Sequence, residues 1–192
     1  MKGDIVRVIS GSQKGRILKA VSGKNTRPTT DKVKESVFNI IGPYFNKGLG
    51  LDLFSGSGSL GIEGISRGLE KVIFVDHHFQ AIDTIKKNIQ ACRFENQSEV
   101  LKMDWNRALQ SVIQRQLSFK VIWLDPPYQL NVYERILEII ASNHLLDDNG
   151  VIVCEHTKDL ILPDKVGPLY KWKYSEYGTI AISIYEKELE TE

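Results

Sequence analysis

Four consecutive residues combine groups that would suit an aromatic amine as a substrate. Asp125, Pro126, Pro127 and Tyr128 directly follow an apolar segment that predicts a strand. Two consecutive prolines remove two backbone donors and keep the chain extended, so the Asp125 carboxylate and the Pro126 carbonyl can point at one place. Both groups accept hydrogen bonds, which suits an NH₂ group with two hydrogens to donate. Tyr128 offers a flat face on which a nucleic-acid base can stack. A purely structural Pro-Pro turn is the alternative.

A glycine-rich turn forms a second candidate site. The sequence GSGSLG (56–61) follows the apolar segment LDLF, and Asp76 ends the next predicted strand, twenty residues after Gly56. Glycines allow a sharp turn from strand to helix and a close approach of a ligand, and a carboxylate at the next strand tip can accept hydrogen bonds from ribose hydroxyls. This arrangement suits NAD and S-adenosylmethionine equally, with an empty structural turn as the alternative. The predicted cofactor contacts in the turn are Phe54, Gly56, Ser57 and Gly58.

Two further acids favour S-adenosylmethionine as the ligand. Asp52 precedes the glycines, where it can meet the ammonium group of this methyl donor, and Asp104 follows the third predicted strand, where it can contact the adenine amine. The carboxyl ends of parallel strands meet in one crevice, where open α/β sheets bind ligands. Each acid could instead cap a helix. Together, Asp52, Asp76 and Asp104 favour the methyl donor.

The expected secondary structure places these residues at one edge of a sheet. Two N-terminal strands (5–9 and 16–21) precede a helix that begins at Thr30 or Asp31 and ends near residue 41. Strands at 50–54, 71–76, 98–103, 119–125 and 150–155 alternate with helices that end near 67 or span 79–91, 105–116 and 131–142. Segments 169–178 and 179–187 predict a terminal antiparallel hairpin. We therefore expect an α/β, Rossmann-like fold with a doubly wound, mostly parallel seven-stranded sheet and a small N-terminal β-hairpin extension.

The net charge of +1 conceals a basic N-terminal arm. Residues 1–34 contain nine Lys or Arg and two Asp, and 9 − 2 gives +7, whereas acids gather in the last residues. A basic arm on an acidic body indicates a local contact with a polyanion, with a solvated hairpin as the alternative. We expect a basic extension (1–30), a methyltransferase domain (31–187) and an acidic tail (188–192).

The remaining composition favours a cytoplasmic enzyme that needs no membrane and no metal. We find no signal peptide and no apolar run long enough to span a bilayer. Cys92 and Cys154 are interpreted as buried thiols in a reducing cytosol. The four histidines lack the spacing of metal ligands.

Several segments together resemble the RsmD-type enzymes, which are bacterial guanine-N2 methyltransferases that modify 16S ribosomal RNA. The likeness rests on RPTTDKVKESVFNIIG (27–42), LDLFSGSGSLGIEGISRG (51–68), FVD (74–76), LDPPY (124–128) and the closing YG…Y strand, and it spans nearly the whole chain. It implies a class I methyltransferase fold and S-adenosylmethionine as cofactor, with no metal. Ser55 and Ser59 depart from the family, where Ala is frequent.

The resemblance also implies roles for individual residues. It assigns Asp52, Gly56, Gly58, Asp76 and Asp104 to the donor, Asp125 to Tyr128 to the target amine, and Arg27 to Thr30 to the rim of the active site. The expected RNA contacts are Lys14, Arg16, Arg27, Thr29 and Thr30. The expected partner is 16S rRNA in an assembled or partly assembled small ribosomal subunit.

Three alternatives remain open. An adenine-N6 DNA methyltransferase uses the same Asp-Pro-Pro-Tyr geometry, but such enzymes usually carry a separate sequence-reading module, for which 192 residues leave little room. A protein glutamine methyltransferase more often has Asn at position 125. A catalytically idle RNA-binding module would give the donor and amine motifs no reason to occur together.

Overall fold

A computed structural model of the protein describes residues 6–21, 31–127 and 129–188. Arg27, Thr29, Thr30 and Tyr128 lie outside the described residues, so their roles stay predictions. Within the described segments, every helix is too short or too polar to cross a lipid bilayer.

The described elements follow the predicted order. The strands are β1 (Val6–Arg7), β2 (Ile17–Leu18), β3 (Leu49–Asp52), β4 (Lys71–Asp76), β5 (Ser98–Lys102), β6 (Phe119–Leu124), β7 (Leu146–Thr157), β8 (Lys165–Val166), β9 (Leu169–Tyr177) and β10 (Ile180–Lys187). The helices are α1 (Asp31–Ile41), α2 (Ser59–Ser66), α3 (Phe79–Cys92), α4 (Trp105–Gln114) and α5 (Tyr133–Ser142), with a short 3₁₀ helix at Glu95–Gln97.

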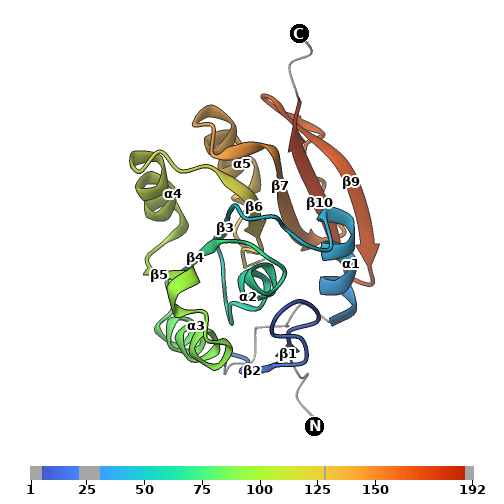
Figure 1. The fold of residues 1–192 in the computed structure, drawn as a ribbon. Coiled ribbons are helices and arrows are strands. Elements are labelled where there is room, and N and C mark those ends of the chain that lie inside the picture. The colour runs from blue at the N-terminus through green and yellow to red at the C-terminus, as the bar shows by residue number, and fades with distance from the viewer. Residues whose placement is uncertain (1–5, 22–30, 128, 189–192) are drawn as a thin grey trace.

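One large sheet organises the molecule (Figure 1). Its strand order is β5-β4-β3-β6-β7-β10-β9-β8, with β5 to β7 parallel and β10, β9 and β8 joined antiparallel. The predicted fold class is confirmed, with an eighth strand in addition to the seven that were expected. This strand, β8, has two residues and pairs with the start of β9. Two residues are too few to show an alternation of apolar and polar positions, so the sequence contains no signal for this strand, which is defined by its backbone pairing.

Helices cover both faces of the sheet, as a doubly wound fold requires (Figure 1). Strand β4 shows the division, because Val72 and Phe74 join one buried cluster and Ile73 and Val75 join the other. The first cluster contains side chains of α1, α2 and α3, and the second contains those of α4 and α5. Side chains alternate between the two faces of a strand, so β4 contributes to both cores.

The N-terminal hairpin of β1 and β2 packs against the body of the protein. Val6, Val8 and Leu18 are buried in the same cluster as α1, α2 and α3. The hairpin therefore shares the core of the sheet domain.

A glycine fixes how closely α2 approaches the sheet. A Cβ at Gly61 would lie 2.3 Å from the Phe74 ring of β4, so a larger residue would force the helix away. The start of α2 is thereby held over the strands that carry the candidate site.

Candidate active site

The strand order brings acids from five strand ends to one edge of the sheet. Asp104 follows β5, Asp76 ends β4, Asp52 ends β3, Asp125 follows β6 and Glu155 lies near the end of β7. These five residues are called the acid row below. The chain passes from β3 outward to β4 and β5 on one side, and from β6 to β7 on the other. Asp52 and Asp125 thus flank the point at which the strand order reverses, where open α/β sheets bind ligands.

The glycine turn leaves β3 in a conformation that suits glycine. Gly56 and Gly58 have φ angles of 54° and 78°, in the left-handed region. Ser55 ties this turn to the neighbouring strand, since its hydroxyl donates to the Asp52 carbonyl (2.7 Å) and accepts from the Val75 N–H (2.9 Å). Ser55, a departure from the resembling family, therefore has a structural role in this chain.

Asp76 and Asp104 both hold local backbone at the ends of their strands. Asp76 accepts from the N–H of Gly56 through Oδ2 (3.0 Å) and from that of His78 through Oδ1 (2.9 Å). Asp104 caps α4, because its Oδ1 accepts from the N–H groups of Asn106 and Arg107, both at 3.0 Å. Helix capping, which the sequence analysis gave as the alternative role of these acids, is thus observed for Asp104. A carboxylate has about four acceptor positions, so neither role excludes a ligand contact.

Asp52, at the end of β3, has a nearly inaccessible carboxyl that bonds to the first turn of α2. Its side chain accepts from the Gly61 N–H (3.1 Å), and the residue is 3% exposed. The pKa of Asp52 is raised from 3.8 to about 7, chiefly by burial and to a smaller extent by the charge of Asp76, while the hydrogen bond from Gly61 opposes the rise. A positive charge beside Asp52 would favour its ionised form.

Asp125 stands in a similar environment on the next strand. Burial, followed by the charges of Glu155 and Asp52, raises the pKa of Asp125 well above 3.8. Within the described residues, no hydrogen-bond donor occupies the Asp125 carboxylate or the Pro126 carbonyl. The next carbonyl, that of Pro127, accepts from the Leu130 N–H (2.8 Å). Among the residues that the structure describes, nothing therefore competes with a ligand for the two acceptors predicted to bind an amine.

Glu155 is a site residue that the sequence analysis missed. It is 6% exposed, it influences Asp125 electrostatically, and its backbone carbonyl accepts from the Tyr133 hydroxyl. The available signal in the sequence was its position at the end of a predicted strand, as Asp76 lies at the end of another. No motif surrounds it, so position alone would have identified it.

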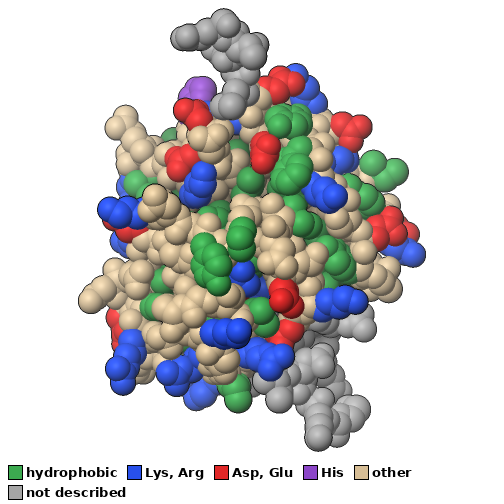
Figure 2. Space-filling view, turned by 45° about the vertical axis from the view of Figure 1, so that its right-hand side comes forward, with side chains coloured by type: hydrophobic (Ala, Val, Ile, Leu, Met, Phe, Trp, Pro, Cys, Tyr) green, Lys and Arg blue, Asp and Glu red, His purple; other side chains and the backbone are tan. Residues whose placement is uncertain are grey.

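The structure separates the predicted RNA-binding residues of the hairpin from the acid row. Lys14 and Arg16 are exposed at the tip of the hairpin, where the neighbouring Gln13 N–H donates to the Ser66 hydroxyl (3.0 Å). Ser66 is the last residue of α2, and the glycine turn precedes the first. The hairpin tip and the glycine turn are therefore about 12 Å apart, the length of eight helical residues. Lys and Arg side chains gather in the lower part of Figure 2, at the height where Figure 1 shows β1 and β2.

One member of the basic arm does not reach solvent. Lys34 is fully buried and pairs with Glu63 (3.4 Å), so it is unavailable to a nucleic acid. Charge counting in the sequence therefore overstated the basic surface of the arm. Among the described residues, no group of three or more His, Cys, Asp or Glu side chains could hold a metal ion.

Solved structures identify the class of protein that this fold and site define. A methyltransferase structure from Escherichia coli, provisionally assigned, matches with a TM-score of 0.80 at 25% identity and covers 97% of this chain and 99% of its own. A provisionally assigned methylase from Haemophilus influenzae matches with a TM-score of 0.78 at 31% identity and the same coverage. The protein has the class I methyltransferase fold.

Sequence comparison identifies the family within this class. A family model described as conserved hypothetical protein 95 matches residues 6–186. Ribosomal RNA small subunit methyltransferase D of Haemophilus influenzae is 38% identical and covers 96% of this chain and 95% of its own. YlbH of Bacillus subtilis, provisionally named an rRNA methyltransferase, is 50% identical over 95% of this chain and 99% of its own. The chain therefore belongs to the RsmD family.

Proposed function

We propose that the protein transfers a methyl group from S-adenosylmethionine to the exocyclic N2 amine of a guanine in 16S rRNA of the small ribosomal subunit. The observation that carries this proposal is the pair of open acceptors, the Asp125 carboxylate and the Pro126 carbonyl, beside the reversal point of the sheet. The name of the Haemophilus influenzae relative supports ribosomal RNA as the substrate class.

The acid row fits a positively charged methyl donor. Burial and neighbouring negative charge raise the pKa values of the Asp52 and Asp125 carboxyls. A nearby cation lowers these pKa values, because it favours the ionised form of each carboxyl. In this proposal Asp52 meets the donor ammonium, Asp76 the ribose hydroxyls and Asp104 the adenine amine. The backbone from Phe54 through Gly56, Ser57 and Gly58 shapes the wall of the pocket. When bound, S-adenosylmethionine supplies an electrophilic methyl group on a sulfonium.

Asp125 and Pro126 prepare the target nitrogen for methyl transfer. Each accepts a hydrogen bond from one N–H group of the amine. These bonds weaken delocalisation of the nitrogen lone pair into the base and direct that pair at the methyl carbon. The lone pair forms the new N–C bond while the C–S electron pair stays with sulfur. The nitrogen then releases a proton, for which the ionised Asp125 carboxylate is the acceptor. Its raised pKa suits it to this role. Pro127 and Tyr128 complete the frame for the base.

The RNA partner in this proposal is folded rRNA in an assembled or partly assembled subunit, and the protein acts in the cytoplasm. Arg27, Thr29 and Thr30 precede α1 in the chain and are assigned to the rim around the target base. Lys14 and Arg16 lie about one helix length from the glycine turn, so we assign them to phosphates that flank the target nucleotide.

Product analysis tests the proposal. Labelled S-adenosylmethionine is incubated with the protein and either undermethylated small subunits or protein-free 16S rRNA, and the RNA is digested to nucleosides. We expect label in N2-methylguanosine, with subunits as the better substrate. Label in N6-methyladenosine would contradict guanine N2 as the target and would identify adenine N6 as the methylated amine. Donor binding without label in any RNA would contradict methylation of rRNA.

A further inference from the structure

Asn88 connects the N-terminal hairpin to the glycine turn through one side chain. This residue of α3 is 1% exposed, and its Oδ1 accepts from the Lys19 N–H (2.8 Å). Its Nδ2 donates to the carbonyls of Lys19 and Ser57, both at 2.9 Å. Both amide hydrogens and the amide oxygen are thus bonded. A carboxylate at this position would face two carbonyl oxygens, so the contacts specifically use an amide.

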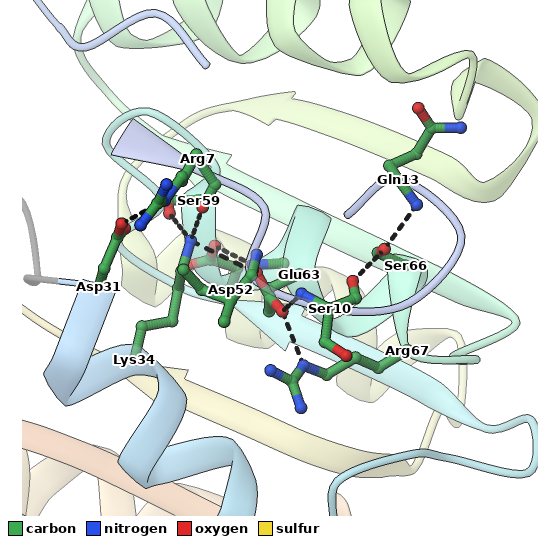
Figure 3. A network of polar contacts seen from close by, with 12 residues as sticks. Arg7, Ser10, Gln13, Asp31, Lys34, Asp52, Ser59, Glu63, Ser66 and Arg67 are labelled. Carbon is green, nitrogen blue, oxygen red and sulfur yellow. Dashed lines mark hydrogen bonds and ion pairs between the residues drawn. The ribbon is translucent and has the colours of Figure 1, made fainter. Parts of the chain in front are cut away.

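A second connection reaches the turn from the other strand of the hairpin. The Lys34 ammonium of α1 donates to the Arg7 carbonyl of β1 and to the Ser59 hydroxyl (3.0 Å), as Figure 3 shows. Ser57 and Ser59 flank Gly58, so the two connections contact the glycine turn on either side of this glycine. Each strand of the hairpin therefore has its own polar link to the proposed donor pocket.

The tip of the hairpin is anchored without touching that pocket. The Ser66 hydroxyl donates to the Ser10 carbonyl (2.6 Å) and accepts from the Gln13 N–H (3.0 Å) at the far end of α2. The hairpin thus runs along α2 from the proposed donor site to its basic tip. A change in the order of one end can be transmitted to the other through a packed hairpin.

We propose that Asn88 is a positioning residue that couples the glycine turn to the hairpin, so that donor binding and RNA binding strengthen each other. This inference rests on the proposed function, because it takes S-adenosylmethionine as the ligand of the turn and rRNA as the ligand of the hairpin. A donor that holds the Ser57 carbonyl in place also holds Asn88 and Lys19. Coupling between binding sites is reciprocal, so RNA on the hairpin increases donor affinity by the same factor.

Hydrogen exchange of the purified protein tests the link without RNA. Calorimetry first gives the affinity for S-adenosylmethionine, and exchange is then followed in residues 16–21 with and without saturating donor. We expect donor to slow exchange there in the wild type and to have no effect there in Asn88→Ala. The variant should also bind donor about three- to tenfold more weakly, as expected when hydrogen bonds are removed.

Ser66→Ala is the matched control, since it loosens the hairpin tip but leaves the Asn88 contacts intact. We expect faster exchange in this control with the donor effect retained at residues 16–21. Should Asn88→Ala fail to fold, Ser59→Ala cuts the second connection at a more accessible position, and the donor effect should then fall at residues 6–9.

Each outcome decides between the two proposals. Donor binding with unchanged exchange in the wild-type hairpin, or an undiminished donor effect in Asn88→Ala, would overturn the coupling but leave methyl transfer intact. Absence of donor binding to the wild type would overturn both. With undermethylated subunits present, donor affinity should rise in the wild type and in Ser66→Ala but stay constant in Asn88→Ala.

Discussion

The carboxyls of Asp52 and Asp125 are arranged in a way that stability alone would not favour. Both are in buried surroundings, and the charge of Asp52 helps to raise the pKa of Asp125. Like charges in a medium of low dielectric constant favour protonation of one partner, unless a cation is present. A site of this kind binds a cationic ligand most tightly when its acids are ionised.

Donor affinity should therefore depend on pH. The pKa of Asp52 lies near 7, above its ordinary value of 3.8, so the proton binds as pH falls through this range. The attraction to a cationic donor is then lost, by at most about tenfold per pH unit for one group. We expect calorimetry to show weaker S-adenosylmethionine binding at pH 6 than at pH 8. Asp52→Asn keeps an acceptor for the Gly61 N–H and should bind more weakly with a shallower pH slope. Equal slopes in the two proteins would contradict the assignment.

Asp125→Ala should separate binding from transfer. In the proposed mechanism the Asp125 carboxylate contacts the target amine, so its loss should lower the single-turnover rate by roughly 10²-fold or more, with much less effect on donor affinity. Saturating undermethylated subunits are used so that the rate reports transfer. A rate within a few-fold of the wild type would show that another group accepts the amine hydrogens.

The sequence predicted where four acids of the candidate site lie, because these residues belong to motifs with a fixed relation to strand ends. Asp52, Asp76, Asp104 and Asp125 all lie at the expected edge of the sheet. Glu155 was missed because it is an isolated acid at the end of the predicted strand 150–155, whose other residues are apolar or glycine. The cap formed by Asp104 could not be separated from a ligand role, because both use the same carboxylate at the same helix start.

At the scale of elements, α2 is the centre to which the hairpin and α1 are attached. Its buried Glu63 accepts from the N–H groups of Ile9 (2.7 Å) and Ser10 (3.0 Å) and from the Arg67 guanidinium (2.7 Å), and it pairs with Lys34. This network is drawn in Figure 3. One carboxylate thus satisfies hairpin backbone and two buried cations at once.

Glu63→Ala should be strongly destabilising, because it leaves Lys34 and Arg67 buried without their partner. Breaking a buried ion pair costs about 3–5 kcal/mol. Glu99→Ala is the control, since Glu99 also pairs with two cations, Lys71 and Arg115, but near the surface, where a pair contributes about 0–1 kcal/mol. Urea unfolding of both variants measures the difference. Equal losses of unfolding free energy would show that the Glu63 network does not hold the hairpin and α1 to the body.

Periodicity predicted the helices and the long strands, since their apolar spacing directly reflects which face is buried. It could not predict β8, whose two residues are defined by pairing with β9. It also could not show that Lys34 and Glu63 are buried, because charged residues are usually exposed unless paired. Their partners come from distant parts of the chain and become visible only in the folded molecule.

At the scale of the whole molecule, the two ends of α2 have opposite electrostatic character. The acid row lies beyond its start, and the exposed basic tip of the hairpin lies at its end. A polyanion such as RNA is repelled by the row and attracted by the tip. A cation in the donor pocket would reduce the repulsion, so the charge pattern favours RNA binding after the donor.

The basic tip should therefore determine how RNA binding depends on salt. Replacing Lys14, Arg16 and Lys19 by Ser should weaken binding to undermethylated subunits and reduce the slope of log affinity against log salt by about 0.7–0.9 for each phosphate that the protein no longer neutralises. Lys120, Lys165 and Lys187 provide a control with the same change of charge, since they lie outside the hairpin, at the start of β6, in β8 and at the end of β10. Filter binding over a range of salt concentrations measures both slopes. An equal change in the two triple variants would mean that net charge, rather than the hairpin tip, sets RNA affinity.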